Sequence, residues 1–332
     1  MTPVRNVNGS VDSNVKQNRS PHISEVIIQL FEILCLILVW SVQSIYFIGE
    51  SLFKMVFQPQ PRSVEGEIVL ITGTGHGIGK ELALKYAEAG ATVVAWDVNK
   101  KNNDGTVKEI NQKYQKKAHG YICDVGSRDS ILEVAKKVQQ EVGDVTILIA
   151  NAGIMPCHLI EEHSADEIRK TIDVNVMQLF WLLEAFLPAM KKNNHGHIVG
   201  ISSIAGIKGF KNVVPYCTSK FAVRGLLESL REELRADRRN RIGTTSIFPY
   251  MVNTGLITNP RIKFEFFMKM LSASEVAECI MMAQRRNEVE ASLPSFLMYF
   301  QTLMRLLPYN AMAKLVDLLD SGIDTESIEE TK

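Results

Sequence analysis

The chain has 332 residues, is 46% hydrophobic and 22% charged, and carries a formal net charge of zero. This composition is ordinary for a globular protein and supplies enough apolar material for one large α/β domain with extensions. The lack of a basic excess argues against nucleic acid as a partner. The five cysteines form no C-x-x-C pair, which favours free thiols in a reducing compartment over a zinc site or a disulfide framework. The seven histidines show no metal-ligand spacing, and we interpret His195 and His197 as a turn that enters a strand.

The first predicted element in chain order is an apolar helix. Residues 1–22 are polar and rich in Asn and Ser, so we expect them to be disordered. Residues 23–57 are predicted to form a membrane-anchor helix, because residues 26–48 are mostly apolar and span about 30 Å, the thickness of a hydrocarbon core. The alternative is a core helix, but its central residues lack the polar face that such a helix has. Residues 58–65, which include "QPQPRS", are predicted to be a stiff linker.

Two polar residues bear on how this helix would sit in a membrane. Glu32 and Gln43 would be costly deep in hydrocarbon, so we favour a shallow, monotopic insertion over a spanning helix. We expect the folded domain to face the cytosol, where its cysteines stay reduced. Two N-x-S sequons, at Asn8 and Asn18, precede the helix and would reach a lumen only if the helix spans the membrane.

Residues 66–293 alternate short apolar runs with helical patterns. The predicted strands cover residues 67–73, 91–97, 120–125, 145–153, 196–203 and 242–249. Strict alternation of strand and helix, with strands that are apolar throughout, predicts a parallel sheet covered by helices on both faces. We therefore expect a Rossmann-type, doubly wound α/β domain.

The first strand runs into the sequence "TGTGHGIG", which opens a helix. Its glycines let the backbone turn tightly and approach a phosphate, and the helix N-terminus offers free N–H groups and the positive end of a dipole. A tight turn alone would not need four glycines. The loop residues predicted to bind a dinucleotide are Gly73, Gly75, His76, Gly77, Ile78 and Gly79.

The ends of the next three strands add further candidates for cofactor binding. Asp97 would accept hydrogen bonds from the ribose hydroxyls and repel a 2′-phosphate, which favours NAD(H) over NADP(H). The alternative is that Asp97 caps the following helix, and the neighbouring Lys100 and Lys101 leave the choice of cofactor open. Beyond the third and fourth strands, the candidates are Asp124, Val125 and Asn151.

Tyr216 and Lys220 lie four residues apart and share one face of a predicted helix. A free tyrosine has a pKa of about 10 and is a poor base near neutral pH. We expect the neighbouring ammonium of Lys220, together with an oxidised nicotinamide, to lower the pKa of Tyr216. Ser203, at the end of a strand thirteen residues upstream, could hydrogen-bond the substrate oxygen while Tyr216 exchanges its proton.

These motifs resemble the short-chain dehydrogenase/reductase family along nearly all of residues 66–293. The matching pieces are "TGTGHGIG", "ANAG", "DVNV", "ISS" and "YCTSK". The resemblance implies a catalytic tetrad of Asn175, Ser203, Tyr216 and Lys220, in which Asn175 holds a water that links Lys220 to solvent. It also implies that Pro249 and Thr254 contact the nicotinamide end of the cofactor. The chain departs from the family at two positions, because Ala150 stands where the family usually has Asn and Tyr250 where it often has Gly.

The apolar N-terminal helix and runs such as "AFLPAMKKNNHGHIV" look like the membrane-bound retinol dehydrogenase and 17β-hydroxysteroid dehydrogenase branch of that family. This implies an endoplasmic reticulum or lipid-droplet membrane and a lipophilic alcohol or ketone as substrate. Residues 250–271, rich in Met and Phe, could line such a pocket or serve as core or membrane contact. Residues 294–332 are predicted to be an apolar helical extension with an acidic tail, and the extension could touch a membrane or pack in a dimer. We expect a homodimer.

The sequence thus predicts a membrane-anchored, NAD-dependent oxidoreductase of lipophilic alcohols or carbonyls such as retinoids or steroids, with Tyr216 as the acid and base. One alternative is an NADP(H)-linked carbonyl reductase, which Asp97 disfavours. The other is a lipid-droplet or membrane scaffold with vestigial activity, which the intact tetrad disfavours.

Overall fold

The computed structural model describes residues 23–114, 118–257, 260–263, 269–319 and 322–323, without the side chains of residues 54–56. The predicted disorder of residues 1–22 and the acidic tail therefore lie outside the described residues. The chain divides into two compact units, Met1–Gln60 and Pro61–Lys332, which are considered separately.

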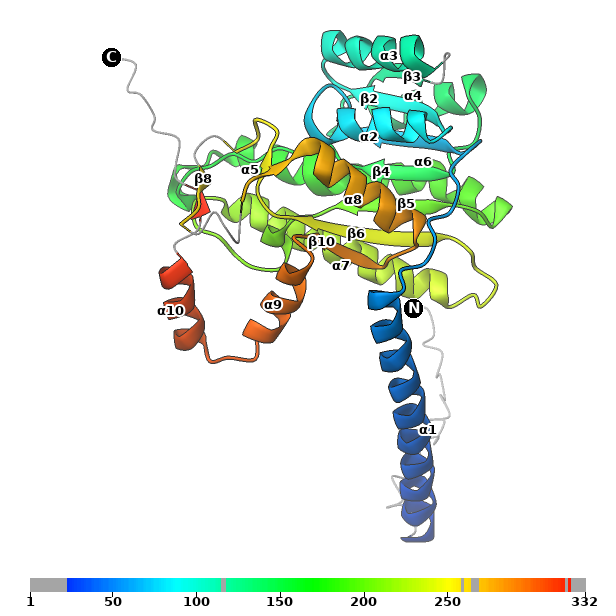
Figure 1. Cartoon of the computed structure of the whole chain (residues 1–332), viewed down its shortest axis with the longest axis vertical. Coiled ribbons are helices and arrows are strands. Elements are labelled where there is room, and N and C mark those ends of the chain that lie inside the picture. The colour runs from blue at the N-terminus through cyan, green and yellow to red at the C-terminus, as the bar shows by residue number, and fades with distance from the viewer. Residues whose placement is uncertain (1–22, 115–117, 258–259, 264–268, 320–321, 324–332) are drawn as a thin grey trace, which may run out of the picture. The chain divides into compact units, whose positions relative to one another are not determined.

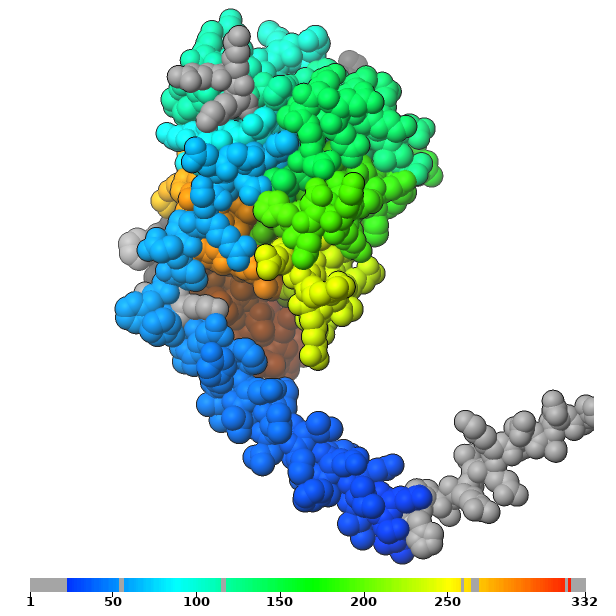
Figure 2. All heavy atoms as spheres, turned by 90° about the vertical axis from the view of Figure 1, so that its right-hand side faces the viewer, coloured from blue at the N-terminus to red at the C-terminus, as the bar shows by residue number. Residues whose placement is uncertain are grey.

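In the first unit, the described residues form one long helix, α1 (Ile23–Val56). Its apolar part, Ile23–Phe53, is long enough to cross a membrane, and none of its most apolar window is buried. Figure 2 shows α1 in dark blue as a single rod of side chains. A helix that exposes Leu, Ile, Phe and Trp around its whole circumference is unfavourable in water, so its composition fits a membrane anchor.

The second unit is built on a seven-stranded sheet in which every neighbouring pair is parallel. The strands, in spatial order, are β10 (Glu290–Leu293), β6 (Gly243–Pro249), β5 (His197–Ile201), β4 (Ile147–Ala150), β1 (Ile68–Thr72), β2 (Thr92–Asp97) and β3 (Ala118–Ile122). The chain winds outward from β1 in both directions, so the switch point lies between β1 and β4. Ligands of such sheets bind beyond the carboxyl ends of the strands at this point.

Helices cover both faces of the sheet (Figure 1). Their bounds are α2 (Gly77–Glu88), α3 (Lys100–Tyr114), α4 (Arg128–Glu141), α5 (Ala165–Ile172), α6 (Gln178–Asn193), α7 (Val214–Arg235) and α8 (Ala273–Arg285). One apolar cluster joins α2 and α8 to the sheet, and a second joins α4, α6 and α7 to it. In Figure 2, α2 (light blue) and α8 (orange) accordingly lie on one flank and α6 (green) on the other.

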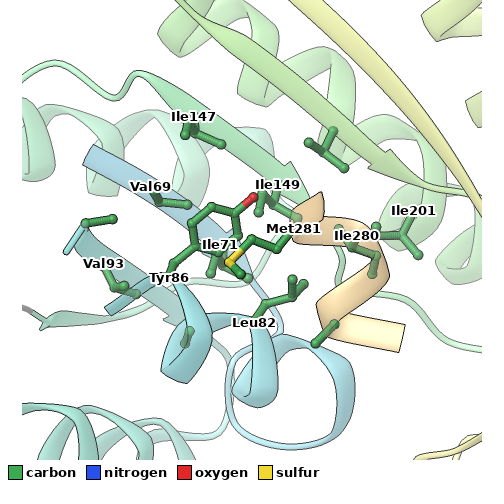
Figure 3. Packing of buried hydrophobic residues seen from close by; sticks show 14 of the residues in the cluster. Val69, Ile71, Leu82, Tyr86, Val93, Ile147, Ile149, Ile201, Ile280 and Met281 are labelled. Carbon is green, nitrogen blue, oxygen red and sulfur yellow. The ribbon is translucent and has the colours of Figure 1, made fainter. Parts of the chain in front are cut away.

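Figure 3 shows the first of these clusters, in which alternate strand residues meet the inner faces of α2 and α8. Tyr86 lies at its centre and is fully buried. Its hydroxyl donates to the Gln284 side chain at 3.0 Å, so the polar end of the ring is satisfied inside the core. Burial raises the pKa of Tyr86 well above its ordinary value. This contact helps to fix α8 against α2.

A second helical run, Ala165–Asn193, is also apolar and long enough to cross a membrane. One third of its most apolar window is buried, and Leu179, Leu182 and Phe186 pack in the second cluster of the sheet. It is therefore a core helix of the domain. Between α5 and α6 it widens into a π-helical turn, η2 (Asp173–Met177).

The chain after β10 forms a helical extension with α9 (Phe296–Met304) and α10 (Tyr309–Leu319). Short strands complete the domain: β7 (Val252–Asn253) pairs with β9 (Leu271–Ser272), and β8 (Pro260–Arg261) pairs antiparallel with β11 (Gly322–Ile323). Segments more than sixty residues apart in sequence are thus joined beyond β6.

The predicted α/β class, the doubly wound parallel sheet and the apolar C-terminal helical extension are confirmed. The predicted third strand, residues 120–125, is displaced, since β3 begins at Ala118 and ends at Ile122. Asp124 and Val125 therefore follow the strand and belong to the turn that leads into α4. The prediction missed β10, whose four residues are too short to produce a clear pattern.

His197 gives the domain a predicted dependence of stability on pH. Its ring is buried beside Thr245, and burial lowers its pKa from 6.5 to about 4, with a smaller contribution from Arg62. The unfolded chain then binds more protons than the folded chain between these values, so stability is full above pH 6.5 and falls as the pH drops towards 4. The loss should reach about 3 kcal/mol.

The midpoint of thermal unfolding of the detergent-solubilised chain, followed from pH 7.5 to 4, measures this effect. His197→Gln keeps a group that can bond Thr245 but has no proton to gain, so its midpoint should fall less steeply. Equal slopes for the two proteins would contradict the assignment.

Candidate active site

The glycine-rich loop leaves β1 at the switch point and is shaped by two close approaches. Gly73 and Gly77 have φ angles of 75° and 58°, a region that residues with a Cβ rarely adopt. A Cβ on Gly79 would lie 2.0 Å from the carbonyl oxygen of Gly73, and one on Gly75 would lie 2.9 Å from Asp97. The loop therefore folds tightly back on itself at the start of α2.

A buried polar hub holds the far side of this loop. Thr74 donates from its hydroxyl to the Asn103 side chain at 2.6 Å, and Thr106 donates to the Thr74 carbonyl at 2.9 Å. The Asn103 amide in turn donates to the carbonyls of Ala95 on β2 and Tyr121 on β3. The loop is thus tied to the carboxyl ends of two strands, which orders it without a ligand.

Gln178 forms a second hub between β1 and β4. It accepts a hydrogen bond from the Thr72 hydroxyl at 3.1 Å and donates to the carbonyls of Ala152, at 2.6 Å, and Val174. The Thr72 hydroxyl oxygen also accepts from the backbone N–H groups of Asn151 and Ala152. The Asn151 side chain donates to the Thr72 carbonyl at 2.8 Å, so the predicted cofactor residue also locks the two strand ends together.

Asp97 ends β2 and accepts two backbone hydrogen bonds. One carboxylate oxygen accepts from the Gly75 N–H at 2.8 Å and the other from the Asn99 N–H at 2.7 Å. Asn99, not Asp97, accepts from the N–H of Asn102 in the first turn of α3. Asn99 therefore caps α3, and the alternative role of Asp97 as that helix cap is wrong. Asp97 instead holds the glycine-rich loop through its bond to Gly75.

These elements surround a long groove at the switch point. The predicted cofactor residues that line it are Gly73, His76, Gly77, Ile78, Asp97, Asp124, Val125, Asn151 and Thr254. Gly75 and Gly79 lie behind this surface and shape it through the close approaches above. Sequence reasoning missed other lining residues, including Trp96, Val98, Cys123 and Lys170, because they carry no recognisable motif. The close backbone turns, the start of α2 and the Asp97 carboxylate together fit a bound dinucleotide.

Tyr216 lies in the first turn of α7 and Lys220 in the second, and both are buried, at 8% and 4% exposure. The Lys220 ammonium lies 5.4 Å from the centre of the Tyr216 ring, so the expected pair is present. It donates to the carbonyl of Ile201, at the end of β5, at 2.9 Å. This bond fixes the long side chain beneath the tyrosine and leaves two of its donors for other partners.

Ser203 and Pro249 complete the wall beside Tyr216. The Ser203 hydroxyl lies 3.4 Å from the Pro249 carbonyl oxygen and accepts from the Ala205 N–H at 3.1 Å. Burial raises the pKa of the Tyr216 phenol, and the nearby Ser203 hydroxyl acts against this rise. Tyr250, at one of the departures from the family pattern, donates from its N–H to Leu293 at 2.8 Å and thereby continues the β6–β10 pairing.

Asn175 lies in the π-helical turn η2, which points its side chain at the site. Its amide donates to the Ile154 carbonyl at 2.9 Å and to the Ser219 hydroxyl at 2.9 Å, and its oxygen accepts from the Ile154 N–H at 2.8 Å. Ser219 donates onward to the Tyr216 carbonyl at 2.7 Å. A Cβ on Gly153 would lie within 3.5 Å of both Asn175 and Lys220, so the two side chains meet over this glycine. The π-turn and Ser219 were not predicted.

Burial dominates the electrostatics of this cluster. It raises the pKa of Tyr216 to about 12, with the Ser203 hydrogen bond acting in the opposite direction, and lowers the pKa of Lys220 to about 8. The lowered Tyr216 pKa expected from the sequence refers to the complex with an oxidised nicotinamide, whose positive charge would act against this effect of burial. At neutral pH the phenol keeps its proton.

Tyr216, Lys220, Ser203 and Pro249 line a second cavity with mostly apolar walls. Its other lining residues include Met155, Phe210, Val213, Met251, Leu256 and Ile257. This cavity and the dinucleotide groove share the lining residues Ile78, Asn151, Gly153, Thr254 and Leu256, so the two are adjacent. Of the predicted apolar segment, residues 264–268 lie outside the described residues.

A Rossmann-type sheet with a dinucleotide groove, next to a cavity lined by a tyrosine, a serine and a lysine, defines an oxidoreductase that uses a nicotinamide dinucleotide. The chain belongs to the short chain dehydrogenase family, whose profile matches residues 67–263. It is similar to human 17-beta-hydroxysteroid dehydrogenase 13, with 38% identity over 84% of the chain and 92% of the relative. Mouse epidermal retinol dehydrogenase 2 is also 38% identical, over 85% of the chain and 92% of the relative.

Solved structures agree on the fold. A short chain dehydrogenase/reductase from Burkholderia phymatum in complex with NAD aligns with a TM-score of 0.66 and 24% identity over 80% of the chain and 99% of its own. A metagenomic short-chain oxidoreductase in complex with NADP aligns with a TM-score of 0.58 and 25% identity over 69% of the chain and 96% of its own. The family resemblance drawn from the sequence is confirmed.

Gly79 and Gly225 make a matched pair for testing the loop. Gly79→Ala places a methyl group against the Gly73 carbonyl, so the loop must open, and we expect at least a hundredfold weaker NADH binding. Gly225 lies inside α7 with open space around it, so Gly225→Ala should leave binding unchanged and stabilise the chain by about 0.5–1 kcal/mol. Fluorescence titration with NADH and thermal unfolding measure the two effects. Wild-type affinity for NADH in Gly79→Ala would show that the glycine-rich loop does not bind the dinucleotide.

Proposed function

We propose that this protein transfers a hydride between NAD(H) and a lipophilic alcohol or carbonyl compound, with Tyr216 as the acid and base. The observation that carries the proposal is the junction of the two cavities. The polar groups Tyr216, Ser203 and Lys220 line a cavity whose other walls are mostly apolar, and five residues of this cavity also line the dinucleotide groove. A hydroxyl or carbonyl at this junction can bond Tyr216 and Ser203 while its apolar body fills the rest.

Each residue near Tyr216 has a separate role in the proposed reaction. A bound nicotinamide dinucleotide supplies the hydride acceptor or donor. Tyr216, protonated at neutral pH, can give its proton to a carbonyl oxygen, and in the reverse direction it takes the proton of the alcohol. Ser203 holds the same oxygen, and the Lys220 ammonium favours the phenolate once the proton has left. Asn175 and Ser219 hold the backbone at Ile154 and Tyr216, and Asn175 would hold the water that links Lys220 to solvent.

The groove favours NAD(H) over NADP(H) because of Asp97. Its carboxylate ends β2 and lines the groove, so a 2′-phosphate placed there would meet a like charge. Lys100, which had left the choice open, is paired with Asp104 at 2.7 Å. Because this pair is exposed it holds Lys100 only weakly, so the assignment rests on Asp97.

Two observations support a lipophilic substrate and a membrane location. The relatives are named for retinol and steroid dehydrogenation, and the apolar walls near Tyr216 suit such molecules. Helix α1 fits an anchor, and the extension exposes large apolar side chains at Tyr299, Leu306 and Tyr309. We propose an endoplasmic reticulum or lipid-droplet membrane with the domain in the cytosol, and α9–α10 as a second contact with its surface. The homodimer stays a prediction.

An activity screen tests the whole proposal. Membranes that contain the protein would be offered retinol, estradiol and a long-chain secondary alcohol, each with NAD and with NADP, and hydride transfer would be followed at 340 nm. Turnover of at least one lipophilic alcohol with NAD is expected. Turnover of none of these alcohols with either cofactor would support the alternative of a scaffold with vestigial activity.

Tyr216→Phe tests the proton donor. Loss of one hydroxyl should reduce kcat by at least about a thousandfold and leave NADH affinity within about twofold, because the ring remains in place. Lys220→Ala should impair both kcat and NADH binding, since its ammonium lies beside Gly153, which lines both the cavity and the groove. Steady-state kinetics and NADH titration separate the two. A Tyr216→Phe protein with a substantial fraction of wild-type kcat would show that the role is misassigned.

Asp97 variants test the choice of cofactor. Asp97→Ala should weaken NADH binding about tenfold or more, through loss of a charge-assisted bond and of the support for Gly75. Asp97→Asn keeps the size and one acceptor but removes the charge, so it should mainly relax discrimination against NADPH. The ratio of kcat/KM for the two cofactors is the measurement. An unchanged ratio in both variants would leave Asp97 with its structural role alone.

The sequons, which lie outside the described residues, report on the anchor. The monotopic insertion favoured here leaves Asn8 and Asn18 unmodified when the protein is made with microsomes. A glycosidase-sensitive mobility shift that disappears in Asn8→Gln would instead show a spanning helix with the N-terminus in the lumen. Release of the protein by carbonate would rule out α1 as an anchor altogether.

A further inference from the structure

The cavity beside Tyr216 has one wall that comes from the far end of the chain. Ile323 lines this cavity, and it is the only lining residue in the described part of the chain that follows Ile257. Its side chain is 8% exposed and belongs to the apolar cluster that contains Tyr216, Val213 and Met251. A residue beyond the last helix of the protein thus stands among the walls of the substrate cavity.

Two hydrogen-bonding arrangements hold Ile323 there. Strand β11, Gly322–Ile323, pairs antiparallel with β8, Pro260–Arg261, in the segment that follows β7. The Asn212 side chain also donates to the Ile323 carbonyl at 2.9 Å in a buried setting. Asn212 has a φ of 67°, which asparagine tolerates better than most residues with a Cβ. It lies in the loop before α7, four residues from Tyr216.

The rest of the extension is fixed to the same walls from outside. Leu297 of α9 is buried against Ile204, Ile207 and Phe248, next to the loop that carries Ser203. Arg305, which follows α9, donates to the Ile207 carbonyl. The extension therefore packs behind the cavity through α9 and enters it through Ile323.

We propose that Ile323 is a specificity-determining residue whose side chain limits the size of the substrate, and that Asn212 is a positioning residue that holds it in place. The proposal rests on the function proposed above and adds to it the part of the chain that selects among lipophilic alcohols. An apolar side chain at this wall excludes bulk and removes water from the substrate body. The polar groups at the junction of the cavities act on the alcohol itself and are the same for every substrate.

Substitutions of Ile323 test the wall directly. A homologous series of secondary alcohols, from 2-butanol to 2-hexadecanol, and a cyclic series up to a steroid would be assayed with NAD. Ile323→Trp should lower kcat/KM for the bulkiest alcohol relative to 2-butanol by about tenfold or more. Ile323→Ala should shift the preference towards bulkier alcohols. Leu318→Ala, an exposed position on α10, is the matched control and should keep the wild-type profile.

Asn212→Gly tests the positioning role. Glycine accepts the φ of 67° but removes the donor, so backbone strain does not confuse the result. We expect KM for long alcohols to rise severalfold while kcat for 2-butanol and the affinity for NADH stay close to wild type. Hydrogen exchange in the peptide that carries Ile323 should become faster. A lower kcat for every substrate, with unchanged exchange, would overturn this role.

A binding measurement separates failure of this inference from failure of the proposed function. If the wild-type chain oxidises none of the alcohols, the proposed function fails. The shift of its thermal midpoint by each alcohol in the presence of NAD then still measures selection by size. Size profiles that are the same in wild type, Ile323→Trp and Ile323→Ala, by kinetics or by thermal shift, would overturn the assignment of Ile323.

Discussion

The site depends on one buried side chain, that of Gln178. It joins the end of β1 through Thr72, the end of β4 through the Ala152 carbonyl, and the π-helical turn through the Val174 carbonyl. The glycine loop starts directly after Thr72, and Asn175 lies within the π-turn, so both sides of the site take their position from the same amide. A buried amide with unsatisfied hydrogen-bonding groups would destabilise the fold. The ends of the two strands must therefore lie where the Gln178 side chain can bond both.

The same region shows how the fold keeps ionisable groups away from water. Lys220 is buried and donates a hydrogen bond to a backbone carbonyl of β5, and Tyr216 is buried beside Ser203. Burial disfavours the charged form of each residue, so it raises the pKa of Tyr216 and lowers the pKa of Lys220. The chain alone therefore holds a protonated phenol over a lysine of low pKa. This arrangement suits proton transfer that is coupled to the arrival of charge in the neighbouring groove.

The substrate cavity is assembled from distant parts of the chain. Its polar end comes from β5, the turn after it and α7, which are central to the sheet. Its apolar walls come from Met155, from the loop before α7, from the segment after β6 and from Ile323, which β8 and Asn212 hold in place. In the proposed function, the reacting groups thus lie on central elements of the domain, and part of the wall that would contact the substrate body lies on peripheral segments.

The sequence by itself determined the sheet, the anchor-like helix and the glycine loop, because each leaves a local pattern. Continuous apolar runs, an unbroken apolar helix and four glycines after a strand can be read without knowing what lies beside them. It also indicated Tyr216 and Lys220 as a pair, since four residues bring two side chains to one helix face. Only the tertiary structure decided the rest. The roles of Gln178, Ser219, Asn212 and Ile323 depend on partners far away in sequence. The direction of the Tyr216 pKa shift depends on burial, which is set by the packing of the whole domain and not by the residue four positions away.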